Sequence, residues 1–515
     1  MTTLIRAGWV VAFDGARHRV IPGGEVAFEG ARVLYAGPRW DGVPGTVVDA
    51  PGMLVVPGFI NTHAHIGVEL MAPFVDLPSD GGRRGRYGPS RAFVANGELP
   101  PSLSPDEQRI SAEFSLVQML RCGATTIVDA AGSGPLWWLG NPPGDEELLL
   151  ETAARVGARV YASLSYRSGR VYYDAGGNAG WHWDVEFGVE GLRRAVDFAV
   201  RHRGTRGGLA ETLLCPHAVD NCSPELLRAT AQAAAEWGLL IQVHCAQYEF
   251  EVQRIRERYG RTPVEHLAHL GFLGPRVILG HTIYVQGHIA VGGDPAKDLR
   301  LIADAGASVA HSPLPFARRG ETLQSFARYR AAGVNVSIGC DIWPADIIQE
   351  MRLAWVLGKA VDRTPSKPTC QDIFDAATIG GARALGRDDL GRLASGAVAD
   401  IVLVDLGRHH FGPIVDPIRA LITCGVGQDV HSVWVAGRRV VSDHQAIFAD
   451  EPALRRGAEE VYRSLVRAAR ARDPVGATPQ EMLRLDYDPP LLNAPMNAGA
   501  AGAPAGMSKW KETRR

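Results

Sequence analysis

The sequence predicts an α/β fold: a TIM-like (β/α)₈ barrel with a small composite β-sandwich domain formed by the N- and C-terminal segments. Through the middle of the chain, eight apolar segments of strand length alternate with helical segments. Strand-like pieces broken by Gly and Pro occur only toward the two ends. Repeated strand-then-helix order is typical of a barrel. The alternative is a doubly wound open sheet, but no Gly-x-Gly-x-x-Gly turn follows the first strand.

The terminal pieces predict two half-sheets that pair as one small domain. They run from Thr3 to about Val56 and return at Ala399–Val404 and Ser432–Val441. The predicted boundaries are 1–56 plus 390–450 for this β-domain, 57–389 for the barrel, and 451–515 for a C-terminal helix and flexible tail.

An apolar run, Met53–Val56, and the segment after Pro57 introduce the first strand of the barrel region. The other seven are expected at Ala124–Asp129, Arg159–Leu164, Gly208–Leu214, Leu239–His244, Val277–His281, Ala307–His311 and Val334–Asp341. The long stretch from Phe74 to Pro101 is predicted to be a lid loop.

Two helices between the strands have clear start and stop signals. One begins at Ser104, with Glu107 at the capping-box position, and ends at Gly123. Another begins at Ser223, which precedes a proline, and ends at Gly238. These signals support the alternation of strands and helices.

The segment from Pro57 to His65 reads Pro-Gly-Phe-Ile-Asn-Thr-His-Ala-His. In a strand, residues two apart point to the same face, so His63 and His65 direct both imidazoles to one point. Two converging neutral imidazoles are suited to binding a divalent metal. Ligands at the C-terminal end of a strand lie where barrel enzymes have their active sites.

Other predicted strands end in residues of the same kind. These are His244, His281, His311 and Asp341. In a parallel barrel all of them project at one rim. Three imidazoles and a carboxylate around an open coordination position would form a catalytic rather than a structural metal site.

At these residues the chain resembles the amidohydrolase superfamily, in its cytosine-deaminase and triazine-chlorohydrolase branch. The resemblance extends from about residue 50 to residue 440. It is carried by Pro57–His65, Cys215-Pro-His217, Val243-His-Cys-Ala-Gln247, Leu279-Gly-His281, Ala310-His-Ser-Pro313, Gly339-Cys-Asp341 and Gly396–Val402.

The resemblance implies one divalent metal ion, most often zinc, with iron, cobalt or manganese also possible. The implied ligands are His63, His65, His244 and Asp341. His281 would orient the water and the developing oxyanion. The two-metal subtype of the superfamily needs a carboxylated lysine on strand four, and the first lysine here is Lys297, so a single ion is expected.

These parts predict a metal-dependent hydrolase in which activated water attacks an sp² carbon of a small cyclic or aromatic substrate. Asp341 would take the proton of the water and return it to the leaving nitrogen. The bond cleaved would be C–N, in an amide, urea, carbamate or exocyclic amine. Alternatives are hydrolytic dehalogenation or deamination of a triazine or pyrimidine ring, and a non-catalytic metal-binding scaffold, against which the complete ligand set speaks.

One residue departs from the pattern of the family. Gln247 stands where related aminohydrolases have a glutamate that shuttles a proton to a ring nitrogen, and either Glu249 or Glu251 could replace it. A neutral amide cannot shuttle a proton, which favours amides, ureas or carbamates. The expected substrate-binding residues are His217, Gln247, His311 and Trp343, with Phe74, Trp137, Trp138 and Tyr166 from loops. Aromatic and neutral polar residues predict a mostly uncharged aromatic or cyclic substrate.

Composition narrows the class of partner. The formal net charge is −2, which does not indicate a nucleic acid or a membrane surface as partner. The N-terminus lacks the layout of a signal peptide, so a cytoplasmic protein is expected. The seven cysteines are widely spaced and are predicted to be reduced. The resemblance also implies a homodimer or larger homo-oligomer.

Overall fold

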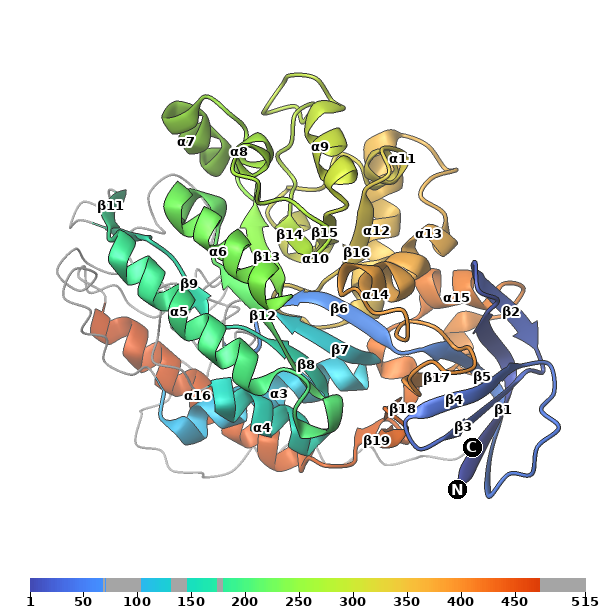
Figure 1. Ribbon diagram of the computed structural model, residues 1–515. Coiled ribbons are helices and arrows are strands. Elements are labelled where there is room, and N and C mark those ends of the chain that lie inside the picture. The colour runs from blue at the N-terminus through green and yellow to red at the C-terminus, as the bar shows by residue number, and fades with distance from the viewer. Residues whose placement is uncertain (68–69, 71–102, 131–145, 174–178, 473–515) are drawn as a thin grey trace, which may run out of the picture.

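Eight parallel strands form a nearly closed barrel in the computed structural model, which describes residues 1–67, 70, 103–130, 146–173 and 179–472 (Figure 1). In barrel order the strands are β6 (Phe59–Ala64), β7 (Ala124–Asp129), β8 (Arg159–Ala162), β12 (Ala210–Pro216), β13 (Leu240–Cys245), β14 (Val277–His281), β15 (Ser308–His311) and β16 (Asn335–Ile338). A parallel bridge between Ala64 and Asp341 brings the last strand back to the first. The predicted barrel is confirmed.

The barrel strands are buried on both faces, as parallel strands covered by helices must be. Every residue of β6, β7 and β13 is buried. Inside the barrel, Gln242 donates to the Thr62 carbonyl at 2.6 Å, and the hydroxyls of Thr62 and Ser337 lie 2.8 Å apart. The first bond crosses the barrel from β13 to β6, and the second joins β6 to its neighbour β16.

Helices follow most of the barrel strands and cover the outside of the barrel (Figure 1). They are α3 (Pro105–Arg121), α4 (Glu146–Val156), α5 (Val185–His202), α6 (Pro224–Trp237), α7 (Glu249–Tyr259), α8 (Pro263–His269), α9 (Lys297–Ala305), α10 (Pro313–Ala317), α11 (Phe326–Ala331), α12 (Ile347–Asp362), α13 (Cys370–Asp375), α14 (Gly381–Ala384) and α15 (Pro417–Cys424). The predicted caps are confirmed: Ser104 and Glu107 form a capping box on α3, and Ser223 caps α6, which ends at the left-handed Gly238.

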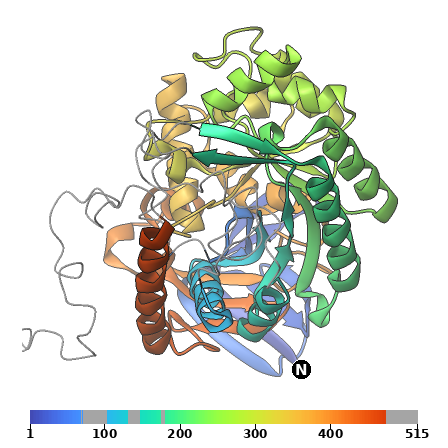
Figure 2. The same ribbon diagram turned by 90° about the vertical axis from the view of Figure 1, so that its left-hand side faces the viewer.

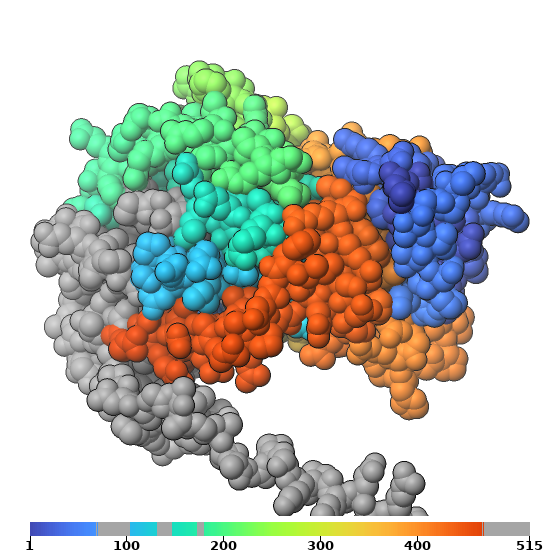
Figure 3. All heavy atoms as spheres, turned by 90° about the horizontal axis from the view of Figure 1, so that it is seen from below, coloured from blue at the N-terminus to red at the C-terminus, as the bar shows by residue number. Residues whose placement is uncertain are grey.

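The two ends of the chain build one sheet. Its N-terminal strands are β1 (Thr2–Phe13), β2 (His18–Pro22), β3 (Glu25–Glu29), β4 (Arg32–Gly37) and β5 (Thr46–Pro57); its C-terminal strands are β17 (Ile401–Asp405), β18 (Val430–Val435), β19 (Arg438–Ser442) and β20 (Gln445–Ala446). The halves join where β5 pairs with β17 in antiparallel register. Figure 3 shows the blue N-terminal and orange C-terminal segments adjoining on one face. The composite β-domain is confirmed, and its predicted boundaries stay a prediction.

The run Met53–Val56 lies at the junction between the composite sheet and the barrel. It forms the end of β5 in the composite sheet and pairs with β17, and the barrel strand β6 starts only at Phe59. Gly58 separates the two strands. One nearly continuous extended segment therefore serves two sheets, which an apolar pattern cannot divide because both parts are buried.

A last helix, α16 (Glu451–Arg472), lies alongside α3 (Figures 1 and 2). Its Val461 and Leu465 share an apolar cluster with Leu103, and Arg121 of α3 pairs with Glu451 at 2.9 Å. None of the described helices is long and apolar enough to cross a membrane. The predicted lid loop at Phe74–Pro101 and the predicted flexible tail lie outside the described residues.

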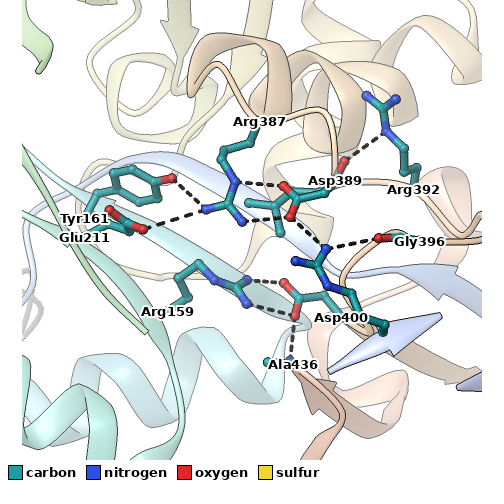
Figure 4. Close-up of polar contacts among 11 residues, drawn as sticks. Arg159, Tyr161, Glu211, Arg387, Asp389, Arg392, Gly396, Asp400 and Ala436 are labelled. Atoms are coloured by element: carbon teal, nitrogen blue, oxygen red, sulfur yellow. Dashed lines mark hydrogen bonds and ion pairs between the residues drawn. The ribbon is translucent and has the colours of Figure 1, made fainter. Parts of the chain in front are cut away.

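A buried ion pair ties the barrel to the composite sheet (Figure 4). Arg159 of β8 and Asp400, just before β17, are each 3% exposed and form a two-pronged contact. Arg159 also donates to the Thr126 hydroxyl at 3.0 Å, and Asp400 accepts the N–H of Ala436 at 2.7 Å. With these bonds both charges are compensated inside the protein.

Replacing Asp400 by Ala is expected to lower the free energy of unfolding by about 3–5 kcal/mol, because it leaves the Arg159 charge buried without its partner. Urea unfolding followed by circular dichroism measures the change. Glu190→Ala is the matched control, since Glu190 pairs with Arg193 on the surface of α5 and its loss should leave the midpoint unchanged. Equal midpoints for Asp400→Ala and the wild type would show that this pair does not hold the two parts together.

Candidate metal centre

His63 and His65 stand at the C-terminal end of β6, and Asn61 helps to fix them. The Asn61 side-chain oxygen accepts the backbone N–H of His63 at 3.3 Å and that of Cys340 at 3.0 Å. This buried amide therefore joins the end of the first barrel strand to the segment after the last one. The two imidazole rings lie 5.2 Å apart, centroid to centroid.

Backbone hydrogen bonds bring Asp341 to the same point. Its N–H donates to the His63 carbonyl at 2.8 Å, and its own carbonyl accepts the N–H of His65 at 2.8 Å. Asp341 has a φ of 58°, a left-handed conformation that is uncommon outside glycine. Its Oδ1 lies 3.1 Å from His65 Nε2 and 3.6 Å from His63 Nε2.

His244, near the end of β13, completes a ring of nitrogens. Its Nδ1 lies 2.6 Å from the His217 carbonyl, which can only accept, so the ring proton sits on Nδ1. Nε2 of His244 therefore carries a lone pair, and it lies 3.3 Å from Nε2 of His65. Imidazole lone pairs that face one point are the arrangement a metal ion requires.

His281 ends β14 beside this group. Its ring lies 4.5 Å from that of His63 and 4.5 Å from that of Phe316. Within the described residues, the atoms close enough to share an ion form two overlapping sets, His63 with His244 and His281, and His63 with His65 and Asp341. His63 is common to both sets and lies at the centre of the cluster.

Two glycines leave the space that His63 fills. A Cβ on Gly280 would lie 2.9 Å from the His63 ring, and a Cβ on Gly339 would lie 2.7 Å from His63 Cβ and 2.9 Å from its carbonyl oxygen. No side chain fits at either position without displacing His63. These two glycines stand directly before His281 and Cys340 in the sequence.

Burial sets the protonation of the cluster. It lowers the pKa of His63 and lowers those of His244 and His281 well below the ordinary value, so these three imidazoles are neutral. Burial alone raises the pKa of the Asp341 carboxyl, but the facing imidazoles, His281 foremost, outweigh it and hold that pKa well below its ordinary value. Neutral imidazoles and an ionised carboxylate are the ligand forms of these side chains.

The donor atoms fit a divalent metal ion. Neither ring nitrogen of His63 has a hydrogen-bond partner among the described residues, although the side chain is completely buried. Leaving buried nitrogens without a partner is costly, and a cation at the meeting point removes that cost. Imidazole nitrogens with one carboxylate oxygen are the usual ligands of catalytic zinc.

The other residues predicted to bind substrate lie at the same rim with different exposure. His217 follows β12, and its ring is 5.0 Å from that of His244. His311 ends β15 and is buried, and burial lowers its pKa to about 3. Gln247 is partly exposed, and Trp343 is 43% exposed.

The prediction that Tyr166 faces the substrate is wrong. Its side chain is completely buried in the main hydrophobic core, and its hydroxyl lies 3.0 Å from that of Thr230 on α6. The carbonyl of Tyr166 accepts the N–H of His217 at 3.0 Å, so it supports the loop instead. Phe74, Trp137 and Trp138 lie outside the described residues.

The two glutamates beyond Gln247 are engaged elsewhere. Both carboxylate oxygens of Glu251 accept backbone N–H groups, from Ala246 at 2.7 Å and from Gln247 at 2.8 Å. Burial, together with the nearby charge of Asp220, raises the pKa of Glu251 to about 8. Glu249 is exposed and accepts a hydrogen bond from Gln253. Glu251 therefore holds the loop after β13 in place.

Sequence reasoning missed the residues that position the site. Asn61 lies inside the quoted segment before His63, and Asn221 contacts His217. Glu251 and Gly339 were named from the sequence, but not for the positions they fix. A buried asparagine next to a metal-ligand motif is a weak signal, since its partners come from distant segments and only the fold reveals them.

Known proteins resemble the chain over most of its length. The sequence profile of the amidohydrolase family matches residues 54–440. A 5'-deoxyadenosine deaminase of Methanosarcina mazei is 26% identical over 455 residues, which cover 86% of this chain and 94% of that protein. A 5-methylthioadenosine/S-adenosylhomocysteine deaminase of Pyrococcus abyssi is 28% identical over 462 residues, covering 88% and 96%.

Solved structures share the fold. An adenosine deaminase from Xanthomonas campestris with bound zinc has a TM-score of 0.72 at 22% identity, covering 90% of this chain and 98% of that one. The atrazine chlorohydrolase TrzN from Arthrobacter aurescens TC1, complexed with zinc, has a TM-score of 0.72 at 24% identity, covering 89% and 100%. At such identities the likeness establishes the architecture only.

Proposed function

The chain belongs to the amidohydrolase family, and from that membership we propose that it hydrolyses a C–N bond at an sp² carbon of a small heteroaromatic or cyclic compound. The observation that carries the proposal is the convergence of four histidines and Asp341 at the C-terminal rim of the barrel. That rim is where barrel enzymes have their active sites.

The metal would be a single ion, most often zinc in sites of this kind. The residues that would hold it are His63, His65, His244 and Asp341. Bound there, a divalent ion supplies Lewis acidity, which lowers the pKa of a coordinated water to about 7 and polarises the substrate. The absence of any lysine before Lys297 supports one ion, because no lysine is present on β12 to bridge a second.

Two residues of the chain would handle protons and charge. Asp341 would accept a proton from the attacking water and deliver it to the leaving nitrogen, since its carboxylate is ionised and lies at the meeting point of the imidazoles. His281, packed between His63 and Phe316, would stabilise the oxygen that becomes negative as the carbon turns tetrahedral.

The loop after β13 limits which leaving groups the site can release. Gln247 is a neutral amide that cannot act as an acid, Glu251 accepts backbone N–H groups, and Glu249 is exposed. A substrate whose ring nitrogen must be protonated by the enzyme therefore fits poorly, whereas amides, ureas and carbamates fit well. Substrate contacts would come from His217, Gln247, His311 and Trp343.

Hydrolytic displacement of halide from a triazine-like ring is the second candidate. The neutral amide of Gln247 neither demands nor forbids it, because a halide departs as an anion and needs no proton. The predicted homo-oligomer stays a prediction.

A substrate panel tests the proposal. The zinc-loaded protein is incubated with cyclic amides, aryl ureas, carbamates, aminopyrimidines and chlorotriazines, and the release of amine, ammonia and chloride is measured. The ring-opened amino acid from the cyclic amides, and free amine from the ureas and carbamates, are the expected products. Chloride release would select the second candidate, and a protein that binds zinc but is inert to the whole panel would point to a non-catalytic scaffold.

Replacing His281 by Ala is expected to reduce kcat by about 10²–10³, the usual cost of losing one stabiliser of a developing oxyanion. The zinc content should stay unchanged, because His281 is not among the proposed ligands. Activity and metal content are measured on the same preparation. Loss of the zinc along with the activity would make His281 a ligand, and near-normal kcat would remove its role.

A further inference from the structure

His217 lies beside the cluster, and its backbone is held from two sides. Its carbonyl accepts the backbone N–H of His244 and lies 2.6 Å from His244 Nδ1, and its backbone N–H donates to the Tyr166 carbonyl. The ring is only 8% exposed and is 5.0 Å from that of His244. Whether its Nε2 donates or accepts a hydrogen bond therefore decides which group a substrate can place next to it.

The orientation of Asn221 follows from its backbone neighbour. Asn221 ends the short 3₁₀ helix η5 (Val219–Asn221) and is 6% exposed. The backbone N–H of Ala218 points at its side-chain oxygen, Oδ1, at 3.1 Å. A backbone N–H can only donate, so the atom facing it must be the oxygen and not the amide nitrogen.

The amide nitrogen of Asn221 then faces His217 Nδ1 at 2.8 Å. An amide NH₂ group can only donate, so Nδ1 must accept and carries no proton. A neutral imidazole has its one proton on the other nitrogen. His217 is thereby fixed with N–H at Nε2.

We propose that Asn221 is a positioning residue for substrate specificity: it keeps His217 in the Nε2–H form, so the site offers a hydrogen-bond donor there and selects substrates that carry an unprotonated ring nitrogen or a carbonyl oxygen at that position. The selection rests on the proposed function, in which His217 contacts the substrate. In a compound with an N–H or an amino group at the same position, that group and the Nε2–H of His217 would both be donors, so no hydrogen bond could form between them.

The segment that carries Asn221 is anchored independently. Asp220 pairs with Arg254 of α7 at 2.5 Å, and the Arg254 guanidinium stacks over the Trp181 ring at 4.1 Å. Trp181 belongs to β11 (Ala179–Trp183), which pairs with β10 (Gly169–Tyr173) as a hairpin. The loop therefore has a fixed position even when the Asn221 side chain changes, so a substitution there acts on His217.

Nitrogen-15 NMR of the zinc-loaded, histidine-labelled protein reads the tautomer directly. The His217 signals are those missing from a His217→Gln variant. We expect a pyridine-type Nδ1 and a pyrrole-type Nε2 in the wild type. A pyrrole-type Nδ1 in the wild type would overturn the proposal, and this result needs neither a substrate nor a variant of Asn221.

Asn221→Asp is the matched substitution, because it keeps an acceptor for the Ala218 N–H and places an acceptor opposite Nδ1. The proton should move to Nδ1. The preference for the best panel substrate over its analogue that lacks the accepting nitrogen or oxygen at that position should fall by about ten- to a hundredfold in kcat/KM, the value of one buried hydrogen bond.

Asp220→Asn serves as the control, since it weakens the anchor to Arg254 but leaves the partner of Nδ1 unchanged. It should keep both the wild-type tautomer and the wild-type preference. An unchanged preference in Asn221→Asp, or an equal loss in Asp220→Asn, would overturn the role in specificity. If no panel compound reacts, the proposed function fails, while the NMR result still decides the tautomer.

Discussion

Replacing Asp341 by Asn is expected to lower kcat by about 10³-fold or more, because one substitution removes both a metal ligand and the proposed proton acceptor. The amide has nearly the size of the carboxylate and can keep the backbone bonds of residue 341 with His63 and His65. Steady-state kinetics in excess zinc separate loss of the ion from loss of the proton acceptor.

Glu249→Gln is the control for that experiment. Glu249 is an exposed carboxylate at the start of α7, and its charge is not part of the cluster. The control variant should keep wild-type kcat. Full activity in Asp341→Asn would refute the role of Asp341, and a large loss in Glu249→Gln would show that Glu249 supplies the proton that Gln247 cannot.

Replacing Gly339 by Ala is expected to abolish zinc binding without altering any ligand. The added methyl would lie 2.7 Å from His63 Cβ and 2.9 Å from the His63 carbonyl oxygen, which accepts the N–H of Asp341. Either His63 or the segment carrying Asp341 must move, and ligand positions must hold to within a fraction of an ångström. Metal content and kcat should fall together.

Gly274→Ala is the matched control, because a Cβ there meets no atom within 4 Å. It should bind zinc and turn over substrate as the wild type does. Wild-type zinc content in Gly339→Ala would mean that the close approach at His63 is not required for the site.

The architecture was predictable because local pattern and position agree. Strand segments such as Ala124–Asp129 match β7 without change, and the histidines at 63, 65, 244 and 281 converge as parallel strand ends must. The register of the barrel strands is enough to predict that these side chains lie at the rim. Predicting which residues contact them requires the complete fold.

What the sequence could not reveal depends on contacts between distant segments. The carboxylate of Asp400 contacts Arg159 only because the composite sheet packs on the barrel. Nothing in the sequence distinguishes Asn221 from other loop residues, and its orientation follows only from the hydrogen bond with the Ala218 N–H. Tyr166 is predicted from the sequence to contact the substrate from a loop, but its ring lies in the core.

Anomalous scattering at the zinc edge from crystals of the zinc-loaded protein tests the central claim most directly. We expect a single peak at the barrel rim, about 2.0–2.2 Å from a nitrogen of each of His63, His65 and His244 and from an oxygen of Asp341. Two peaks, or one peak away from these four side chains, would contradict it.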